Sequence, residues 1–154
     1  MIKLKDLLFE NDAPNIFVPR RIEGRFERMI KSYIRNGSKG DLNLNIMNLT
    51  KLPEMLKDIT VDGDFYCGNN NLTSLKFAPS SVGGSFYCSS NELTSLEGAP
   101  TNVGRNFDCG FNNLTSLEGA PKSVGGNFWC EANTVKFTEE QVRAECDVKG
   151  KVIV

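Results

Sequence analysis

Five cysteines are the side chains with the clearest chemical potential in this chain of 154 residues. Four of them recur every 21 residues, at Cys67, Cys88, Cys109 and Cys130. Zinc sites use closely spaced pairs such as C-x-x-C, often with histidine, and this chain has no histidine. Disulfides between neighbouring repeats are sterically conceivable, but the cytosol disfavours them. We therefore expect a ladder of buried, reduced thiols, with Cys146 outside it on a cap or at the surface.

The sequence contains few of the side-chain combinations that enzymes commonly use for catalysis. The lack of histidine removes Ser-His-Asp and Cys-His nucleophiles and histidine general bases. Asp62 and Asp64 form the closest carboxylate pair of interest, but we expect them on a turn. The Gly-Gly pairs recur with the repeat and lack the G-x-x-x-x-G-K-[ST] pattern of a phosphate loop. We predict a protein that is not an enzyme, with no catalytic residue, metal site or cofactor.

The 21-residue interval extends to every position around the cysteines and defines an internal repeat. From Val82 to Pro100 the unit reads Val-Gly-Gly-x-Phe-x-Cys-x-x-Asn-x-Leu-Thr-Ser-Leu-x-x-Ala-Pro. A degenerate copy lies 23 residues upstream of the first regular one, where Leu44 replaces the cysteine and Met47 replaces the asparagine. Residues 151–154 imitate the strand segment once more. Five coils and a sixth, closing strand are therefore expected.

Each coil should contribute one short strand to a parallel sheet. Phenylalanine and cysteine alternate with a period of two, so both side chains point inward and the residue between them points outward. The glycines before the strand are expected to supply unusual backbone angles, and the proline after it prevents helix continuation. The other side of the coil should be extended or turn-like. A leucine or valine at the next inward position completes the core: Leu72, Leu93, Leu114 and Val135.

These positions resemble the leucine-rich-repeat family, whose Leu-x-Leu-x-x-Asn-x-Leu core becomes Phe86-Tyr87-Cys88-Ser89-Ser90-Asn91-Glu92-Leu93 here. The Asn-x-Leu-Thr-Ser-Leu segment is similar to short bacterial and bacteriophage repeats, including those of secreted effectors. The resemblance covers roughly residues 40–137 and implies a leucine-rich-repeat solenoid with about five to six short strands. It also implies that a ladder of asparagine amides satisfies backbone groups of the turns: Asn70, Asn91, Asn112 and Asn133.

Both ends of the repeats carry signs of caps. Apolar residues between Ile22 and Ile34 follow a helical pattern that ends near Gly37, and this N-terminal cap helix belongs to a unit over residues 1–39. Thr138 to Gln141 is a capping-box sequence, which predicts a short C-terminal cap helix to about Glu145 within residues 138–154. The repeats occupy residues 40–137 between them. The polar face of the first helix forms a basic patch: Arg20, Arg21, Arg25, Arg28, Lys31 and Arg35.

The outward positions are free of the demands of the core. They combine aromatic side chains with carboxylates, the mixture found in binding surfaces: Tyr66, Tyr87, Asp108, Phe111, Trp129 and Glu131. The leading hypothesis is a module that binds a protein partner with this concave face. The alternative for the same residues is cross-strand stacking that only stiffens the sheet.

Two further functions stay open. Residues 1–40 carry nine Lys/Arg against five Asp/Glu, so the basic patch could bind nucleic acid, or it could simply keep the helix soluble. Self-assembly through the aromatic face or the terminal strand is a third hypothesis for a chain expected as a monomer or a weakly self-associating species. We expect no membrane segment and no secretory signal, and therefore a cytoplasmic protein, in the host cytoplasm if a bacteriophage encodes it.

Overall fold

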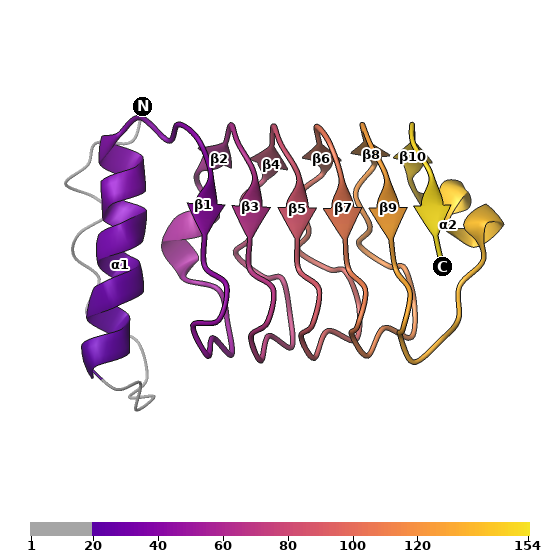
Figure 1. The fold of residues 1–154 in the computed structure, drawn as a ribbon, viewed down its shortest axis with the longest axis horizontal. Coiled ribbons are helices and arrows are strands. Elements are labelled where there is room, and N and C mark those ends of the chain that lie inside the picture. The colour runs from indigo at the N-terminus through magenta and orange to yellow at the C-terminus, as the bar shows by residue number, and fades with distance from the viewer. Residues whose placement is uncertain (1–19) are drawn as a thin grey trace.

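The computed structural model describes residues 20–154, so residues 1–19 of the predicted N-terminal unit lie outside the described residues. The same holds for the side chains of residues 20–23 and 25, although their backbone belongs to a helix. The chain forms a parallel β-solenoid of about five turns, as predicted. Figure 1 shows the turns side by side in one row, with a helix at each end.

One wall of the solenoid is the predicted parallel sheet, and every neighbouring pair of strands keeps the repeat register. It has six strands of two residues each: β1 (Leu42–Asn43), β3 (Phe65–Tyr66), β5 (Phe86–Tyr87), β7 (Phe107–Asp108), β9 (Phe128–Trp129) and β11 (Val152–Ile153). The first strand comes from the degenerate copy and the last from the closing segment. Both of those assignments from the sequence are confirmed.

A second sheet, which we did not predict, forms where extended or turn-like backbone was expected. Its five strands are also parallel: β2 (Thr60–Val61), β4 (Ser81–Val82), β6 (Asn102–Val103), β8 (Ser123–Val124) and β10 (Asp147–Val148). Each strand buries one valine of the repeat and leaves the preceding residue more exposed. A single-turn 3₁₀ helix, η1 (Glu54–Leu56), interrupts the first coil.

The core lies between the two sheets and repeats with the coils. Four stacked phenylalanines at its centre are fully buried: Phe65, Phe86, Phe107 and Phe128. Their successive ring centroids lie 5.2, 5.6 and 5.0 Å apart. The prediction of a buried side chain is wrong in one coil: Val135 is 37% exposed, whereas its three leucine counterparts are buried. That coil borders the C-terminal cap and has no following regular repeat to cover it.

In the regular repeats the glycines before the strands serve close packing of coils, which corrects the prediction of unusual backbone angles there. Gly40, before β1, does adopt a positive φ of 81°. Gly83 and Gly84 do not have positive φ values. A Cβ atom on Gly83 would lie 2.6 Å from the carbonyl oxygen of Asp62 in the coil before it. The left-handed conformation also occurs three residues after the first five strands of the six-stranded sheet, at residues that are not glycine: Ile46, Asn69, Ser90, Phe111 and Ala132.

Helix α1 (Arg20–Arg35) lies beside β1 and covers the first coil (Figure 1). Ile30 and Tyr33 are buried against the core, and the Tyr33 hydroxyl donates a hydrogen bond of 2.7 Å to the carbonyl oxygen of Ser38. Burial and the nearby carboxylate of Asp62 raise the pKa of Tyr33. None of the helices in residues 20–154 has the length and apolar character that a bilayer crossing requires.

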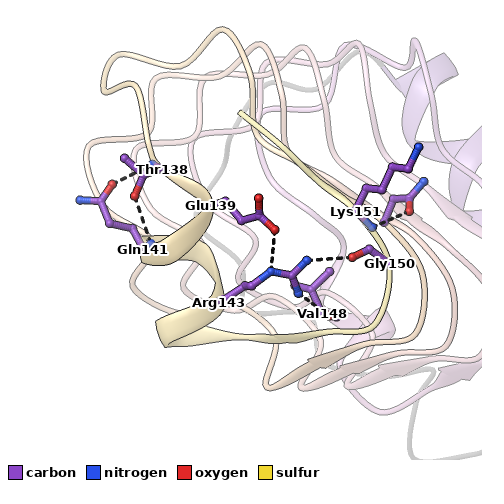
Figure 2. Close-up of polar contacts among 8 residues, drawn as sticks. Thr138, Glu139, Gln141, Arg143, Val148, Gly150 and Lys151 are labelled. Atoms are coloured by element: carbon purple, nitrogen blue, oxygen red, sulfur yellow. Dashed lines mark hydrogen bonds and ion pairs between the residues drawn. The ribbon is translucent and has the colours of Figure 1, made fainter.

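Helix α2 (Glu139–Glu145) covers the other end, and its predicted capping box is confirmed. The backbone N–H of Gln141 donates to Thr138 Oγ1, and the Gln141 side chain accepts from the backbone N–H of Thr138. Arg143 reaches from this helix to the last turn, where it donates to the carbonyl oxygens of Val148 and Gly150 at 2.7 and 3.0 Å (Figure 2). These bonds satisfy backbone groups that no further coil would pair.

Candidate interaction surface

The cysteines occupy packing positions. All five are free thiols with at most 2% exposure, and the predicted inward ladder is confirmed for the four in the repeats. Burial disfavours the thiolate and raises the pKa of Cys67, Cys88 and Cys109 far above the ordinary value. Cys146 is buried at the end of α2, where its pKa is raised to about 11. In residues 20–154, no three metal-ligating side chains come together.

The asparagine ladder satisfies backbone groups of the turns, as the resemblance implied, and it also holds neighbouring coils together. Asn112 shows the pattern: its Nδ2 donates to the carbonyl oxygens of Cys88 and Cys109, both at 3.1 Å. Its Oδ1 accepts from the backbone N–H of Leu93 at 3.1 Å. Asn70, Asn91 and Asn133 repeat these contacts. These amides are fully engaged in the fold.

A second polar ladder, which sequence reasoning missed, runs along the residue just before each strand. The side-chain oxygen in one coil accepts from the backbone N–H of the same position in the next coil. Its members are Asp41, Asp64, Ser85, Asn106 and Asn127, and the last donor is Lys151. The sequence signal that could have revealed this ladder was a short polar side chain at the same position in every coil. The ladder assigns Asp64 to the fold, and Asp62 Oδ1 accepts a hydrogen bond from the backbone N–H of Gly40.

The outward residues of the six-stranded sheet form a continuous line across the strands, here called the face row. The strand register places these residues next to one another in this order: Asn43, Tyr66, Tyr87, Asp108, Trp129 and Ile153. The structure thereby aligns four of the six residues that the sequence singled out for binding. Glu131 lies two residues after the end of β9, and Phe111 lies three residues after the end of β7.

Tyr66 and Tyr87 support each other within the fold. Their rings stack at 4.9 Å between centroids with an interplanar angle of 12°. The Tyr66 hydroxyl donates a 3.0 Å hydrogen bond to Asp64 Oδ2. Burial first, and then this hydrogen bond, raise the pKa of Tyr66 to about 12. Cross-strand stacking that stiffens the sheet therefore accounts for Tyr66. The ring of Tyr87 has a second face that the stack with Tyr66 does not cover.

The side chains of Asp108 and Glu131 both approach Gly110. Asp108 Oδ1 accepts from the backbone N–H of Gly110 at 3.0 Å. A Cβ atom on Gly110 would lie 3.2 Å from the carbonyl oxygen of Glu131, 3.4 Å from Asp108 Oδ1 and 3.7 Å from Glu131 Cγ. Glu131 Oε2 is enclosed and has no hydrogen-bond partner among the described residues. No ion pair of residues 20–154 engages either carboxylate.

Glu131 also borders a small cavity of about 230 Å³ between the last coil and the chain's C-terminal strand segment. Lys136, Phe137 and Val154 line it together with Glu131. Lys136 is the basic residue of this cavity, yet it lies beyond ion-pair distance of Glu131. The cavity is too small for a typical drug-sized ligand, for which pockets of roughly 300–1,000 Å³ are usual.

Phe111 has the most unusual combination of features on this surface. Its side chain is 60% exposed, and its backbone has a φ of 53°. Bulky side chains rarely adopt this left-handed conformation, because Cβ then approaches the following carbonyl oxygen. Asn69, Ser90 and Ala132 hold the same repeat position with smaller side chains. Ile46 holds it in the first coil and is 76% exposed.

The basic patch is only partly described. Arg28 and Arg35 are exposed on α1, and Lys31 lies 3.9 Å from Glu27 in an ion pair. Arg35 donates to the carbonyl oxygen of Lys31 within its own helix. The side chains of Arg20, Arg21 and Arg25 lie outside the described residues. The described part shows ordinary helix-surface contacts, which agree with the soluble-helix alternative.

Comparison with protein-family models, with curated proteins and with solved structures found no match. The chemistry of the exposed residues is therefore what separates the candidate functions. Cysteines, asparagines and the polar ladder are accounted for by the fold. Around β7 and β9, Phe111 is exposed, and Asp108, Trp129 and Glu131 are half-buried.

Proposed function

We propose that this protein is an interaction module that binds a partner protein with the central part of its face row. The binding surface comprises Tyr87, Asp108, Phe111, Trp129 and Glu131, with Tyr66 as a support behind Tyr87. The 21-residue unit and its asparagine ladder also support membership of the leucine-rich-repeat proteins, in which sheet faces are common binding surfaces. A cytoplasmic location and a bacterial or bacteriophage-type modulator of a host protein follow from the same resemblance as parts of this proposal.

The observation that carries the proposal is the exposed Phe111 in a left-handed backbone conformation. The conformation costs a bulky residue about 1–2 kcal/mol, and solvent exposure returns little hydrophobic stabilisation. Three neighbouring coils fill the same position with asparagine, serine or alanine, so the solenoid does not need an aromatic ring there. A partner that buries this ring would recover the cost, as aromatic anchors do at the centre of protein interfaces.

Trp129 adds a second anchor two strands away from Tyr87 in the face row. It is half-buried, and its indole N–H has no hydrogen-bond partner among the described residues. A large ring with a free donor is typical of interface hot spots, because one side chain supplies both apolar area and a directed hydrogen bond. The carboxylates of Asp108 and Glu131, which form no ion pair within residues 20–154, give the surface a polar component.

The test is affinity capture from a lysate of the native host with the wild type and with Phe111→Asn. Asparagine tolerates the left-handed conformation, so the variant should fold at least as well as the wild type. Ile46→Asn is the matched control, because it removes an exposed apolar side chain from the same backbone conformation in the first coil. The proposal requires a protein that the wild type and the control retain and that Phe111→Asn loses.

Equal retention by all three forms would contradict the proposal. Retention that disappears as salt rises, with nucleic acid among the bound species, would instead identify the basic helix as the working surface. Sedimentation that shows a dimer of the wild type but a monomer of Phe111→Asn would assign the face row to self-association.

A further inference from the structure

The face row has one gap between its aromatic rings, and a carboxylate lies in that gap. Asp108 pairs with Tyr87 on one side and with Trp129 on the other. Parallel strands lie about 4.8 Å apart, so the two rings stand on strands separated by roughly 9–10 Å. A group midway between them would lie about 5 Å from each ring, within the ~6 Å over which an aromatic face attracts a cation.

One wall of the gap is fixed by the fold. Tyr87 stacks on Tyr66, and Tyr66 is held in place by its hydrogen bond to Asp64. The corresponding space between Tyr66 and Tyr87 is closed, because their ring centroids are only 4.9 Å apart. The gap over Asp108 is therefore the place in this row where a flat group can enter between two rings.

The gap also has an excess of negative charge without a partner. Asp108 Oδ1 accepts from the backbone of Gly110, while its Oδ2 takes part in no hydrogen bond within the described residues. Glu131 Oε2 is enclosed by the protein and equally without a partner. A cation that bonds to Asp108 Oδ2 would pair this carboxylate, and the nearby acidic side chain of Glu131 would attract the same cation.

We infer that the gap between Tyr87 and Trp129 binds an arginine side chain of the partner protein, with its guanidinium over Asp108 and near Glu131. A guanidinium is planar, stacks on aromatic faces, and presents several N–H donors in one plane. These properties match two ring walls and the Asp108 carboxylate better than the compact ammonium of lysine does. The inference rests on the proposed function and names the chemistry of the partner's anchor.

The probe is an acetylated and amidated Gly-Ser-Arg-Ser-Gly peptide, titrated into the full chain. Trp129 is the single tryptophan of the protein, so its indole N–H resonance reports on this site alone. We expect a saturable shift with the arginine peptide, affinity lower by roughly threefold to tenfold with lysine in its place, and no shift with the neutral isostere citrulline.

Asp108→Asn/Glu131→Gln tests the carboxylates while it preserves their shapes, and asparagine keeps the acceptor for the Gly110 N–H. We expect this variant to bind the arginine peptide at least roughly tenfold more weakly. Glu97→Gln/Glu118→Gln is the matched control, since it removes two exposed carboxylates outside the face row and should bind as the wild type does. A shift of equal size with citrulline, or unchanged affinity in the first variant, overturns the inference.

The same variants separate this inference from the proposed function. If a captured partner depends on Phe111 but binds Asp108→Asn/Glu131→Gln as tightly as the wild type, the interaction module stands and the arginine anchor is wrong. If the peptide behaves as expected while no partner depends on Phe111, the guanidinium site stands and the proposed function fails. A wild-type dimer that the carboxylate variant abolishes would make a second copy the source of the cation and overturn the assignment to a partner protein.

Discussion

The interior of the solenoid and its face row are built on the same repeat but follow opposite rules. The inward positions are nearly identical in successive coils, with phenylalanine, cysteine, asparagine and leucine each stacked on its own copy. The face row changes from coil to coil, although its backbone register is just as regular. Regular backbone therefore does not by itself demand regular side chains.

The difference shows where folding determines the residue type. Asn112 joins two neighbouring coils through four hydrogen bonds to backbone groups, so the fold determines its residue type. Phe111, its neighbour in sequence, is 60% exposed and occupies a backbone conformation that disfavours it. Asn112 and Phe111, although adjacent, thus differ completely in how far folding determines the residue type. Substitutions of inward-facing and outward-facing residues test whether this contrast is real.

The largest effect is expected in the phenylalanine stack. Phe107 is fully buried between the rings of Phe86 and Phe128. Phe107→Ala should lower the free energy of unfolding by about 3–5 kcal/mol, because it leaves a cavity and removes both stacking contacts. Urea denaturation followed by circular dichroism measures the loss. Trp129→Ala, one coil away on the face row, should cost clearly less, and an equal cost would contradict the comparison.

The asparagine ladder should come next. Asn112→Ala leaves the buried N–H of Leu93 without a partner and removes one of the two amide donors to each of the carbonyl oxygens of Cys88 and Cys109. Since an unpaired buried N–H costs about 1–3 kcal/mol, we expect a loss of that size. Asn113→Ala, at the exposed neighbouring position, is the control and should change the same urea midpoint little. Similar midpoints for the two variants would contradict the assigned roles.

The buried thiols predict a loss of stability at alkaline pH. Burial raises the pKa of Cys67, Cys88 and Cys109, so these thiols stay protonated in the folded chain while they ionise in the unfolded chain above a pH near 9. The unfolded state then binds fewer protons, and stability falls by about 1.4 kcal/mol per pH unit for each thiol. Below that pH these groups should have no effect.

Urea midpoints measured between pH 8 and roughly 10.5 check this slope. Cys88→Ala should show a shallower fall than the wild type, because it lacks one of the buried thiols whose pKa is raised; Cys130 and Cys146, with pKa values raised to about 11, contribute to the fall in both forms. Tyr66, with its pKa raised to about 12, adds to the loss only above the ordinary tyrosine pKa. Stability that stays constant across the range would show that the thiols are accessible to water in the folded chain.

The sequence predicted the parts of the fold that depend on repetition and alternation. Phenylalanine and cysteine alternate in every coil, which located the six-stranded sheet, and the spacing of Thr138 and Gln141 located the start of α2. The second sheet escaped notice because each of its strands has two residues and one inward valine, too short for alternation to be visible. Its signal was the recurrence of that valine in every coil.

Features that depend on distances between coils could not be predicted from the sequence of a single coil. Gly83 looked like a residue chosen for its backbone freedom, whereas it is needed because a carbonyl oxygen of the preceding coil lies against it. Val135 matched the inward pattern but has no following repeat to bury it. The candidate surface was chosen from residue types, and the structure added the register, the carboxylate pair near Gly110 and the conformation of Phe111.

The account's central claim, that the face row is kept for binding and not for folding, is tested most directly by the free energy of unfolding of Phe111→Asn. The account predicts a gain of about 0.5–1 kcal/mol over the wild type, because asparagine tolerates the left-handed conformation and no buried contact is lost. A loss of more than about 1 kcal/mol would contradict it, since Phe111 would then serve the stability of the solenoid.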